Sequence, residues 1–152
     1  MEQLILSVDF MHKRRIIHRD IKLDNILISN IEEGKHLNVK ISDFGLSRFL
    51  STNKNEKLRE KCGTPCYIAP EILNGHSYNE MADIFSIGSV FFNLLTGRYL
   101  FEGSNVQEIL SNNKKCTIVS QICIFLKDFS FECRDLIQKL LSFDPNLRPT
   151  AE

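Results

Sequence analysis

The apolar stretch from Met81 to Leu95, which ends at Gly97, limits more than any other feature how this chain can fold. Its apolar residues follow one another so closely that little of it can face water. A helix that is apolar on most sides has to be covered by other parts of the chain. We therefore predict a central buried helix here, with the rest of the 152 residues packed around it as one unit.

Two segments on the N-terminal side of this helix also have regular patterns. Over residues 2–13 the apolar side chains recur at helical spacing, which predicts an amphipathic helix. Two short apolar runs, Asn25–Ser29 and Leu37–Ser42, flank a polar stretch that contains Gly34. This pattern predicts a small β-hairpin.

The remaining segments are a loop and two helices. Residues 50–61 are polar and charged without an apolar period, which is typical of a long functional loop. Ser104, followed three residues later by Gln107, predicts a capping box at the start of a helix. A further helix is expected from about Ser130 to Leu141, since Asp144-Pro145 lies beyond its end.

Composition excludes several classes of function. Nineteen basic and nineteen acidic residues give no net charge, so the overall field draws the chain neither to nucleic acid nor to a membrane surface. The polar N-terminus fits neither a secretory signal nor a membrane span, and an intracellular, cytoplasmic protein is expected. Five cysteines without a C-x-x-C pair are expected to be reduced thiols.

Three short motifs follow one another in a fixed order. Residues 18–25 read HRDIKLDN and open the predicted hairpin, residues 43–45 read DFG and follow it, and residues 63–71 read GTPCYIAPE and close the polar loop. Each match alone is weak, but the order and spacing together form the protein-kinase signature set. Over essentially its whole length, the chain resembles a eukaryotic-type protein kinase.

This resemblance implies transfer of the γ-phosphoryl group of ATP with Mg²⁺. Such a transfer needs a carboxylate near the acceptor hydroxyl, a cation near the phosphate and hard oxygen ligands for magnesium. By resemblance, Asp20 orients and deprotonates the hydroxyl, and Lys22 contacts the γ-phosphate. Asn25 and Asp43 are the expected magnesium ligands. An apolar column beneath the adenine would be formed by Leu27, Val90 and Leu94, although ordinary core positions explain these residues equally well.

Other residues match structural positions of the same family. Glu71 is expected to pair with Arg148 and to tie the end of the polar loop to the helical body. Asp83 resembles the aspartate that fixes the backbone of the family's catalytic loop. Both are fold contacts and not part of the chemistry.

The type of acceptor follows from two of the motifs. Lys22 and the pair Gly63-Thr64 resemble serine/threonine kinases, so the expected partners are ATP and a protein with a Ser or Thr acceptor. Residues 61–71 and 96–103 resemble the calcium/calmodulin-dependent group. Asp24 stands where an acidic residue of related kinases meets basic residues upstream of the acceptor.

The polar loop also suggests how the active arrangement is held. In kinases with an arginine before the catalytic aspartate, that arginine needs an anion from this loop, commonly a phosphate. Here the arginine is Arg19, and Glu60 stands three residues before Gly63, where the phosphorylated residue often lies. We predict a cluster of Arg19, Arg48 and Glu60; the alternative is that Glu60 is one more solvated charge.

The expected fold is mostly α with one small β-hairpin, as in the kinase C-lobe. We interpret residues 1–152 as one partial kinase domain in which the N-lobe, with its Gly-rich loop and lysine, and the family's final helix are absent. Two functions remain open: protein phosphorylation by a kinase of which this is a fragment, or an inactive lobe that serves as a protein-binding module. The intact Asp20, Asn25 and Asp43 favour the first.

Overall fold

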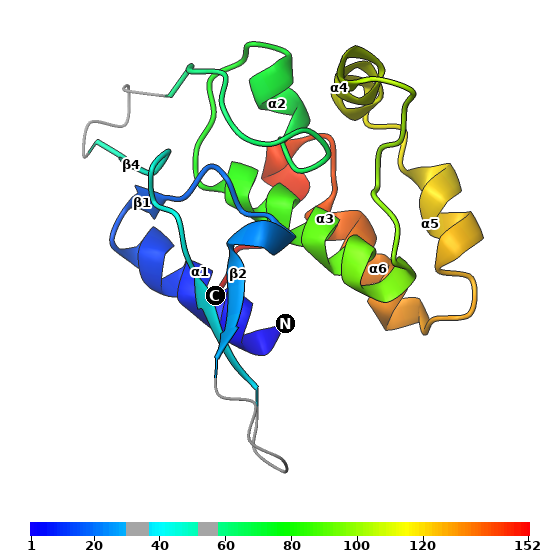
Figure 1. The fold of residues 1–152 in the computed structure, drawn as a ribbon, viewed down its shortest axis with the longest axis horizontal. Coiled ribbons are helices and arrows are strands. Elements are labelled where there is room, and N and C mark those ends of the chain that lie inside the picture. Colours follow the sequence, from blue (N-terminus) through cyan, green and yellow to red (C-terminus); the bar gives the residue numbers. More distant parts are fainter. Residues whose placement is uncertain (30–36, 52–57) are drawn as a thin grey trace.

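The computed structural model describes residues 1–29, 37–51 and 58–152, and its helices surround α3 (Figure 1). In these ranges the α-helices are α1 (Glu2–Lys13), α2 (Pro70–Leu73), α3 (Met81–Thr96), α4 (Val106–Lys115), α5 (Val119–Phe125) and α6 (Phe131–Leu140). Figure 1 places α1 and the strands on one side of α3, and α4 and α5 on the other. Short 3-10 turns occur at Leu23–Asn25 and Pro145–Leu147.

The predicted hairpin is present, but it is not the only pair of strands. β2 (Ile26–Ser29) and β3 (Asn38–Ile41) pair antiparallel, with Ile26 opposite Ile41. The turn predicted between them falls in residues 30–36, outside the described part. A second two-stranded sheet, which the sequence did not predict, pairs β1 (Ile16–Ile17) with β4 (Arg48–Phe49). Strands of two residues are too short for their alternation to be visible in a sequence.

The central helix α3 is as buried as its sequence predicts. Phe85 and Phe92 are completely buried on it. It ends at Gly97, whose left-handed φ of 68° glycine adopts without strain. A Cβ atom on Gly88 would lie 2.9 Å from side-chain atoms of Leu140 and Leu141. Gly88 therefore allows α6 to pack directly against α3.

The helices after α3 differ from the prediction in detail. The capping box lies one residue later than predicted: Asn105 accepts a hydrogen bond from the backbone N–H of Glu108, and Glu108 accepts one from the N–H of Ser104. Gln107 takes no part in this cap. The helix α6 begins where the sequence predicts, and Ser130 caps it by accepting from the N–H of Cys133. The short helices α2 and α5 were not predicted, since neither is long enough to show a helical period.

The apolar core has two parts that α3 separates. One part joins α2, α4, α5 and α6, and the other joins α1 to the segment that carries the first motif. All five cysteines are free. Burial raises the pKa of the Cys66 thiol and raises that of Cys116 to about 12, so both stay protonated at neutral pH. In the described part of the chain, no helix combines the length and the apolar character that crossing a lipid bilayer requires.

Candidate active site

The first motif forms the loop 18–25 between β1 and β2, and Asp83 of α3 holds its backbone. The carboxylate of Asp83 accepts hydrogen bonds from the backbone N–H of His18 and of Arg19, both at 2.9 Å. His12 of α1 adds a contact from Nε2 to Asp83 Oδ2 at 3.0 Å. Arg19 has a left-handed φ of 69°, a conformation that costs a non-glycine residue about 1–3 kcal/mol. The expected structural role of Asp83 is therefore present, with two helices fixing a strained loop.

Asp20, Lys22 and Thr64 form a closed triangle of polar contacts. Lys22 Nζ lies 2.9 Å from Asp20 Oδ2 and donates a hydrogen bond to Thr64 Oγ1, also at 2.9 Å. Thr64 in turn donates to Asp20 Oδ1 at 2.6 Å. Each oxygen of the Asp20 carboxylate therefore has its own partner, and the two contacts hold the side chain in one orientation.

The surroundings of Asp20 also set its charge. Burial by itself would raise the pKa of the carboxyl, but the hydrogen bonds from Thr64 and Lys22 and the charge of Lys22 outweigh it. The pKa of Asp20 therefore lies below its ordinary value of 3.8. The carboxylate stays ionised at neutral pH and is available to accept a hydrogen bond.

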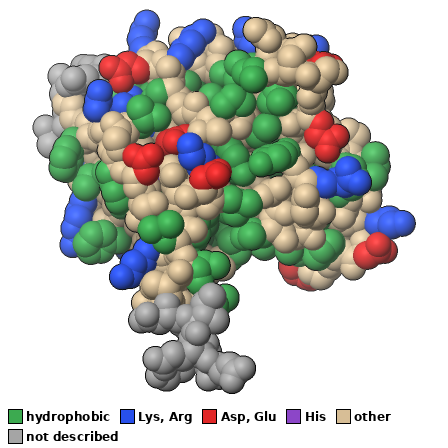
Figure 2. Space-filling view, viewed as in Figure 1, with side chains coloured by type: hydrophobic (Ala, Val, Ile, Leu, Met, Phe, Trp, Pro, Cys, Tyr) green, Lys and Arg blue, Asp and Glu red, His purple; other side chains and the backbone are tan. Residues whose placement is uncertain are grey.

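The hairpin brings Asn25 next to Ser42, the residue before Asp43. Asn25 Nδ2 donates to the backbone oxygen of Asp20 at 2.9 Å and lies 3.4 Å from Asp20 Oδ2. Ser42 bonds to the backbone oxygen of Asn25 through its N–H at 2.9 Å and its Oγ at 3.1 Å. The next residue, Asp43, has a left-handed φ of 63° and accepts from the N–H of Gly45. In Figure 2 acidic and basic side chains gather near this end of the hairpin.

The three residues of the expected adenine column do not share one environment. Val90 is completely buried in the core, which is what the ordinary-core interpretation predicts. Leu27 on β2 is 51% exposed, and Leu94 on α3 is 58% exposed. Only Leu27 lies on the hairpin that carries Asn25, so it is the member of the set best placed to meet a nucleotide.

Arg19, Arg48 and Glu60 form the predicted cluster. Arg19 Nη1 lies 2.9 Å from Glu60 Oε2, and Arg48 Nη2 lies 3.8 Å from the same oxygen. Hydrogen bonding and charge from Arg19, with the charge of Arg48, lower the pKa of Glu60. Tyr78 completes the cluster because its hydroxyl accepts from Arg19 and donates to the backbone oxygen of Glu60. Glu60 is therefore paired with both arginines, although its side chain is 62% exposed and remains in contact with solvent.

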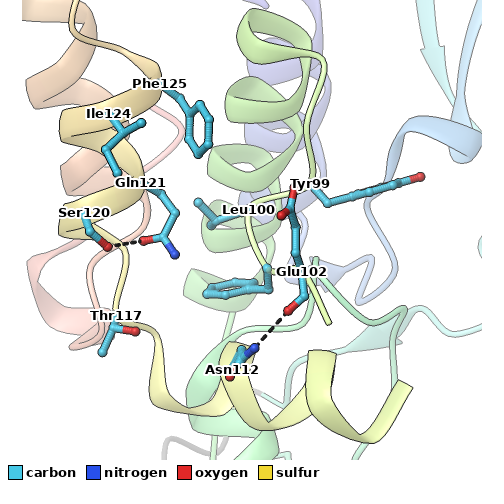
Figure 3. Close-up of a pocket in the computed structure, with 10 residues that line it drawn as sticks. Tyr99, Leu100, Glu102, Asn112, Thr117, Ser120, Gln121, Ile124 and Phe125 are labelled. Atoms are coloured by element: carbon cyan, nitrogen blue, oxygen red, sulfur yellow. Dashed lines mark hydrogen bonds between the residues drawn. The ribbon is translucent and has the colours of Figure 1, made fainter. Parts of the chain in front are cut away.

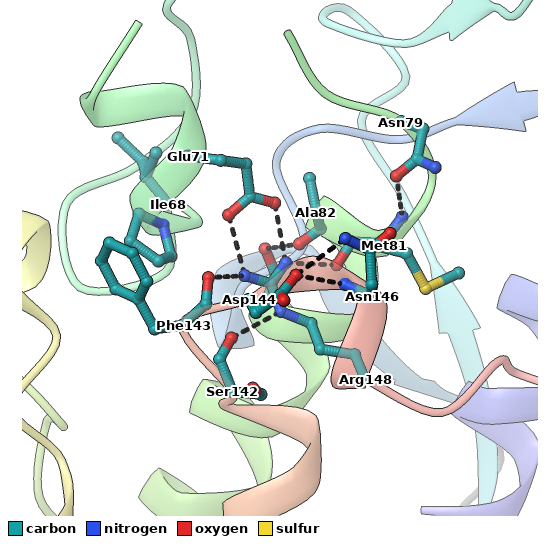
Figure 4. Close-up of polar contacts among 12 residues, drawn as sticks. Ile68, Glu71, Asn79, Met81, Ala82, Ser142, Phe143, Asp144, Asn146 and Arg148 are labelled. Carbon is teal, nitrogen blue, oxygen red and sulfur yellow. Dashed lines mark hydrogen bonds and ion pairs between the residues drawn. The ribbon is translucent and has the colours of Figure 1, made fainter. Parts of the chain in front are cut away.

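Glu71 and Arg148 form the expected buried ion pair (Figure 4). Two parallel hydrogen bonds of 2.7 and 2.8 Å join their side chains. Arg148 also donates to the backbone oxygens of Met81, Ser142 and Phe143. The pair thereby fastens α2, at the end of the loop that carries Thr64, to the start of α3 and the segment after α6.

Sequence reasoning missed three members of this site. The motifs indicated Thr64 only as a marker of the type of acceptor, and no motif in the sequence pointed to His12 or Tyr78. Thr64 is 44 residues from Asp20, and nothing in a single threonine indicates a partner at that distance. The position of Tyr78 beside the loop depends on the bridge between Leu58 and Tyr78, which the sequence does not indicate.

Comparison with known proteins supports the interpretation of the three motifs as those of a protein kinase. A family model described as the protein kinase domain matches residues 1–152. CBL-interacting protein kinase 5 of Oryza sativa is 41% identical over 99% of this chain, and the chain covers 31% of that protein. A probable serine/threonine-protein kinase, CCRP1 of Zea mays, is 39% identical over 99% of the chain, which covers 23% of it. Serine/threonine-protein kinase PLK4 of Drosophila yakuba is 38% identical over the whole chain, which covers 18% of it.

These relatives carry protein-kinase names although they come from plants and an insect. Each is named as a protein kinase, and each aligns across nearly the whole of this sequence. The chain spans less than a third of their length. The match to the family model and the serine/threonine kinases among its relatives together place this chain in the protein kinase domain family.

Proposed function

We propose that this chain is the catalytic C-terminal lobe of a kinase that transfers the γ-phosphoryl group of ATP to Ser or Thr residues of proteins. The observation that carries the proposal is the triangle of Asp20, Lys22 and Thr64. It holds an ionised carboxylate and an ammonium group in fixed positions next to each other. Phosphoryl transfer depends mainly on such positioning and on charge stabilisation.

Asp20 is the proposed acceptor of the substrate hydroxyl's proton. A carboxylate has about four lone-pair positions. Within the described residues, Asp20 uses them for Thr64, Lys22 and the longer contact to Asn25, which leaves capacity for a substrate hydroxyl. Lys22 has three N–H donors, of which Asp20 and Thr64 occupy two. The third can bond to a phosphate oxygen, so Lys22 can link the phosphate to the carboxylate.

Asn25 and Asp43 are the proposed ligands of the magnesium ion that the family uses. The Nδ2 atom of Asn25 is occupied by Asp20, which leaves its Oδ1 atom for a cation. Asp43 uses one carboxylate oxygen for Gly45. Two such side chains suit Mg²⁺, which binds one or two side chains together with substrate phosphates and would neutralise their charge.

The surface around the hairpin supports the assignment to the C-terminal lobe. Leu6 and Phe10 of α1, with Phe44 of the DFG motif, are each more than half exposed. They line an apolar hollow of about 570 Å³ beside β3. Apolar surface of this extent favours contact with further protein. We propose that an N-lobe of the full-length protein covers it and that Leu27 faces the adenine ring.

Within the serine/threonine kinases, we keep the likeness to the calcium/calmodulin-dependent group as part of the proposal. It rests on residues 61–71 and 96–103. The alternative function, an inactive lobe that only binds other proteins, also uses the exposed apolar surface. A lobe that only binds other proteins would not need the bonded arrangement of Asp20, Lys22 and Thr64. We therefore prefer the catalytic function.

The test uses the full-length protein with labelled ATP, Mg²⁺ and a library of Ser-, Thr- and Tyr-containing peptides. Phosphate is expected on Ser or Thr, and the variants Asp20→Asn and Asp43→Asn are expected to transfer it much more slowly. Asp128→Asn, an exposed carboxylate in the turn after α5, is the control and should retain activity. Transfer to Tyr alone, or equal activity in wild type and Asp20→Asn, would refute the proposal.

A further inference from the structure

The consecutive backbone carbonyls of residues 66–68 each accept a hydrogen bond from a buried side chain. In the order of the carbonyls that they bind, the donors are Ser89 Oγ at 2.7 Å, Ser86 Oγ at 2.8 Å and Asn113 Nδ2 at 2.8 Å. The two serines belong to α3 and the asparagine belongs to α4. We call residues 64–68 the threonine segment. Two helices therefore hold this segment from its buried side.

The backbone of the threonine segment is strained. Cys66 has a left-handed φ of 75°, a conformation that residues other than glycine rarely adopt. Next to it, the N–H of Tyr67 donates to the backbone oxygen of Thr64 at 3.1 Å, so Thr64 belongs to the same bend. A strained conformation of this kind persists only where surrounding groups fix it. The buried donors from α3 and α4 are such groups.

Asn113 occupies a position where α4 would otherwise carry an apolar side chain. Ile109 and Leu110 lie four and three residues before it, on the same face of the helix, and both pack against the core. Asn113 is completely buried on this face. A carbonyl only accepts hydrogen bonds, so Nδ2 faces Ile68, and Oδ1 has no partner among the described residues. A buried polar atom without a partner is destabilising. The amide is therefore explained by the bond to the threonine segment and not by packing.

The threonine segment controls the carboxylate of Asp20 from both of its ends. Thr64 at its start donates the 2.6 Å hydrogen bond to Asp20 Oδ1. At its other end, Ile68 packs against Gly63: a Cβ atom on Gly63 would lie 3.1 Å from the Ile68 side chain and 3.0 Å from the backbone oxygen of Arg19. Gly63 is thus enclosed between Ile68 and the loop that carries Asp20. A shift of Ile68 would be passed to Gly63 and so to its neighbour Thr64.

We propose that Asn113 and Ser89 are positioning residues for phosphoryl transfer. They hold carbonyls of the threonine segment, and this segment sets where Thr64 places the Asp20 carboxylate. The inference rests on the proposed function, since it gives both residues a role in that reaction. It connects α4, which carries none of the three motifs, with the reacting group.

Asn113→Leu is the main test variant, because leucine has nearly the same shape and suits the apolar face of α4. It removes the donor to the threonine segment without leaving a gap. The matched control is Asn112→Leu on the same helix. Asn112 Nδ2 also donates to a backbone oxygen, at 2.9 Å, but that oxygen belongs to Glu102, outside the threonine segment (Figure 3). Ser89→Ala is the second test variant and deletes a single atom.

The first readout is catalysis by the folded full-length protein. Urea denaturation of each variant defines the conditions in which it is folded, and kcat is compared only there. Asn113→Leu should lower kcat about tenfold with unchanged affinity for a fluorescent nucleotide, since a misplacement of about 1 Å can cost about 10²-fold. Ser89→Ala should also lower kcat, and Asn112→Leu should match the wild type. A merely structural role would lower the urea midpoint and leave kcat unchanged.

The second readout is the pKa of Asp20, which does not require activity. Carbon NMR of isotope-labelled protein follows the Asp20 carboxyl group, with Asp20→Asn to assign the signal. The hydrogen bond from Thr64 lowers this pKa, so a displaced Thr64 in Asn113→Leu should raise it. In a Thr64→Val background the bond is already absent, and Asn113→Leu should cause no further rise. This double-mutant cycle isolates the route through Thr64.

The proposal is overturned if folded Asn113→Leu keeps the wild-type kcat or the wild-type pKa of Asp20, or if the pKa rises equally in the Thr64→Val background. If Asn113→Leu does not fold, Ser89→Ala decides by the same measures. If the wild type transfers no phosphate but the pKa of Asp20 still depends on Asn113, the proposed kinase activity fails and the positioning stands. Phosphate transfer that does not depend on Asn113 has the opposite meaning.

Discussion

Replacing Glu71 by Gln tests how the loop that carries Thr64 is anchored. The substitution keeps the shape of the side chain but leaves the guanidinium of Arg148 without its counter-ion. The Arg148 side chain is completely buried and Glu71 is 5% exposed, so water cannot replace the lost charge. Removing one partner of a buried ion pair costs about 3–5 kcal/mol. Three backbone oxygens still accept from Arg148, which favours the lower end, about 3 kcal/mol.

Urea denaturation of the full-length protein, followed by circular dichroism and by activity, measures this effect. A loss of about 3 kcal/mol is a large part of the 5–15 kcal/mol that stabilises a typical domain. Activity should be lost at lower urea concentration than in wild type, because α2 connects Glu71 to the loop that orients Asp20. Asp128→Asn, at an exposed carboxylate in the turn after α5, is the control and should leave the midpoint unchanged.

A double variant shows whether the loss of stability in Glu71→Gln comes from the unpaired buried charge or from altered packing. Replacing both Glu71 and Arg148 by Met removes the pair without leaving a buried charge, and such replacements are often nearly neutral. The double variant should therefore be more stable than Glu71→Gln. A Glu71→Gln protein whose free energy of unfolding falls by less than about 1 kcal/mol would refute the reasoning, since that is the cost expected for an exposed pair.

Three further predictions concern the site. Thr64→Val removes a hydrogen bond that lowers the pKa of Asp20, so the pKa of Asp20 should rise in the variant. Because the ionised carboxylate is the active form, the acid limb of the kcat/KM profile should move to higher pH. An unchanged pH profile would contradict this. Glu60→Gln should reduce activity, whereas phosphatase treatment of wild type should not; full activity in Glu60→Ala would end the idea that this carboxylate orders the loop. The 152-residue chain alone should turn over a Ser/Thr peptide negligibly compared with the full-length protein, and turnover that Asp20→Asn abolishes would disprove it.

The parts of the fold that sequence reasoning predicted are those with a strong local pattern. The central helix α3 follows from its continuous apolar character, and the hairpin follows from two apolar runs around a polar stretch. The pairing of β1 with β4 could not be predicted in this way, since two residues on each side carry no period. The capping box was placed one residue early because Ser104 and Asn105 are both good N-cap residues, and only the fold selects Asn105.

The candidate site shows the same limit. The motifs identified Asp20, Lys22, Asn25 and Asp43 because each lies in a short sequence of known order. Thr64 became visible as a partner of Asp20 only in the folded chain, because its contact depends on the anchoring of a distant loop.

The most direct test of phosphoryl transfer by Asp20 is a single-turnover measurement. The full-length wild type and Asp20→Asn are each saturated with labelled ATP and mixed with a Ser peptide, while binding of a fluorescent nucleotide is measured separately. Nucleotide affinity should be the same in both proteins, and the rate of transfer should fall about 10²- to 10⁴-fold in the variant, the usual contribution of a positioned base. A transfer rate in Asp20→Asn equal to that of wild type would contradict the role of Asp20.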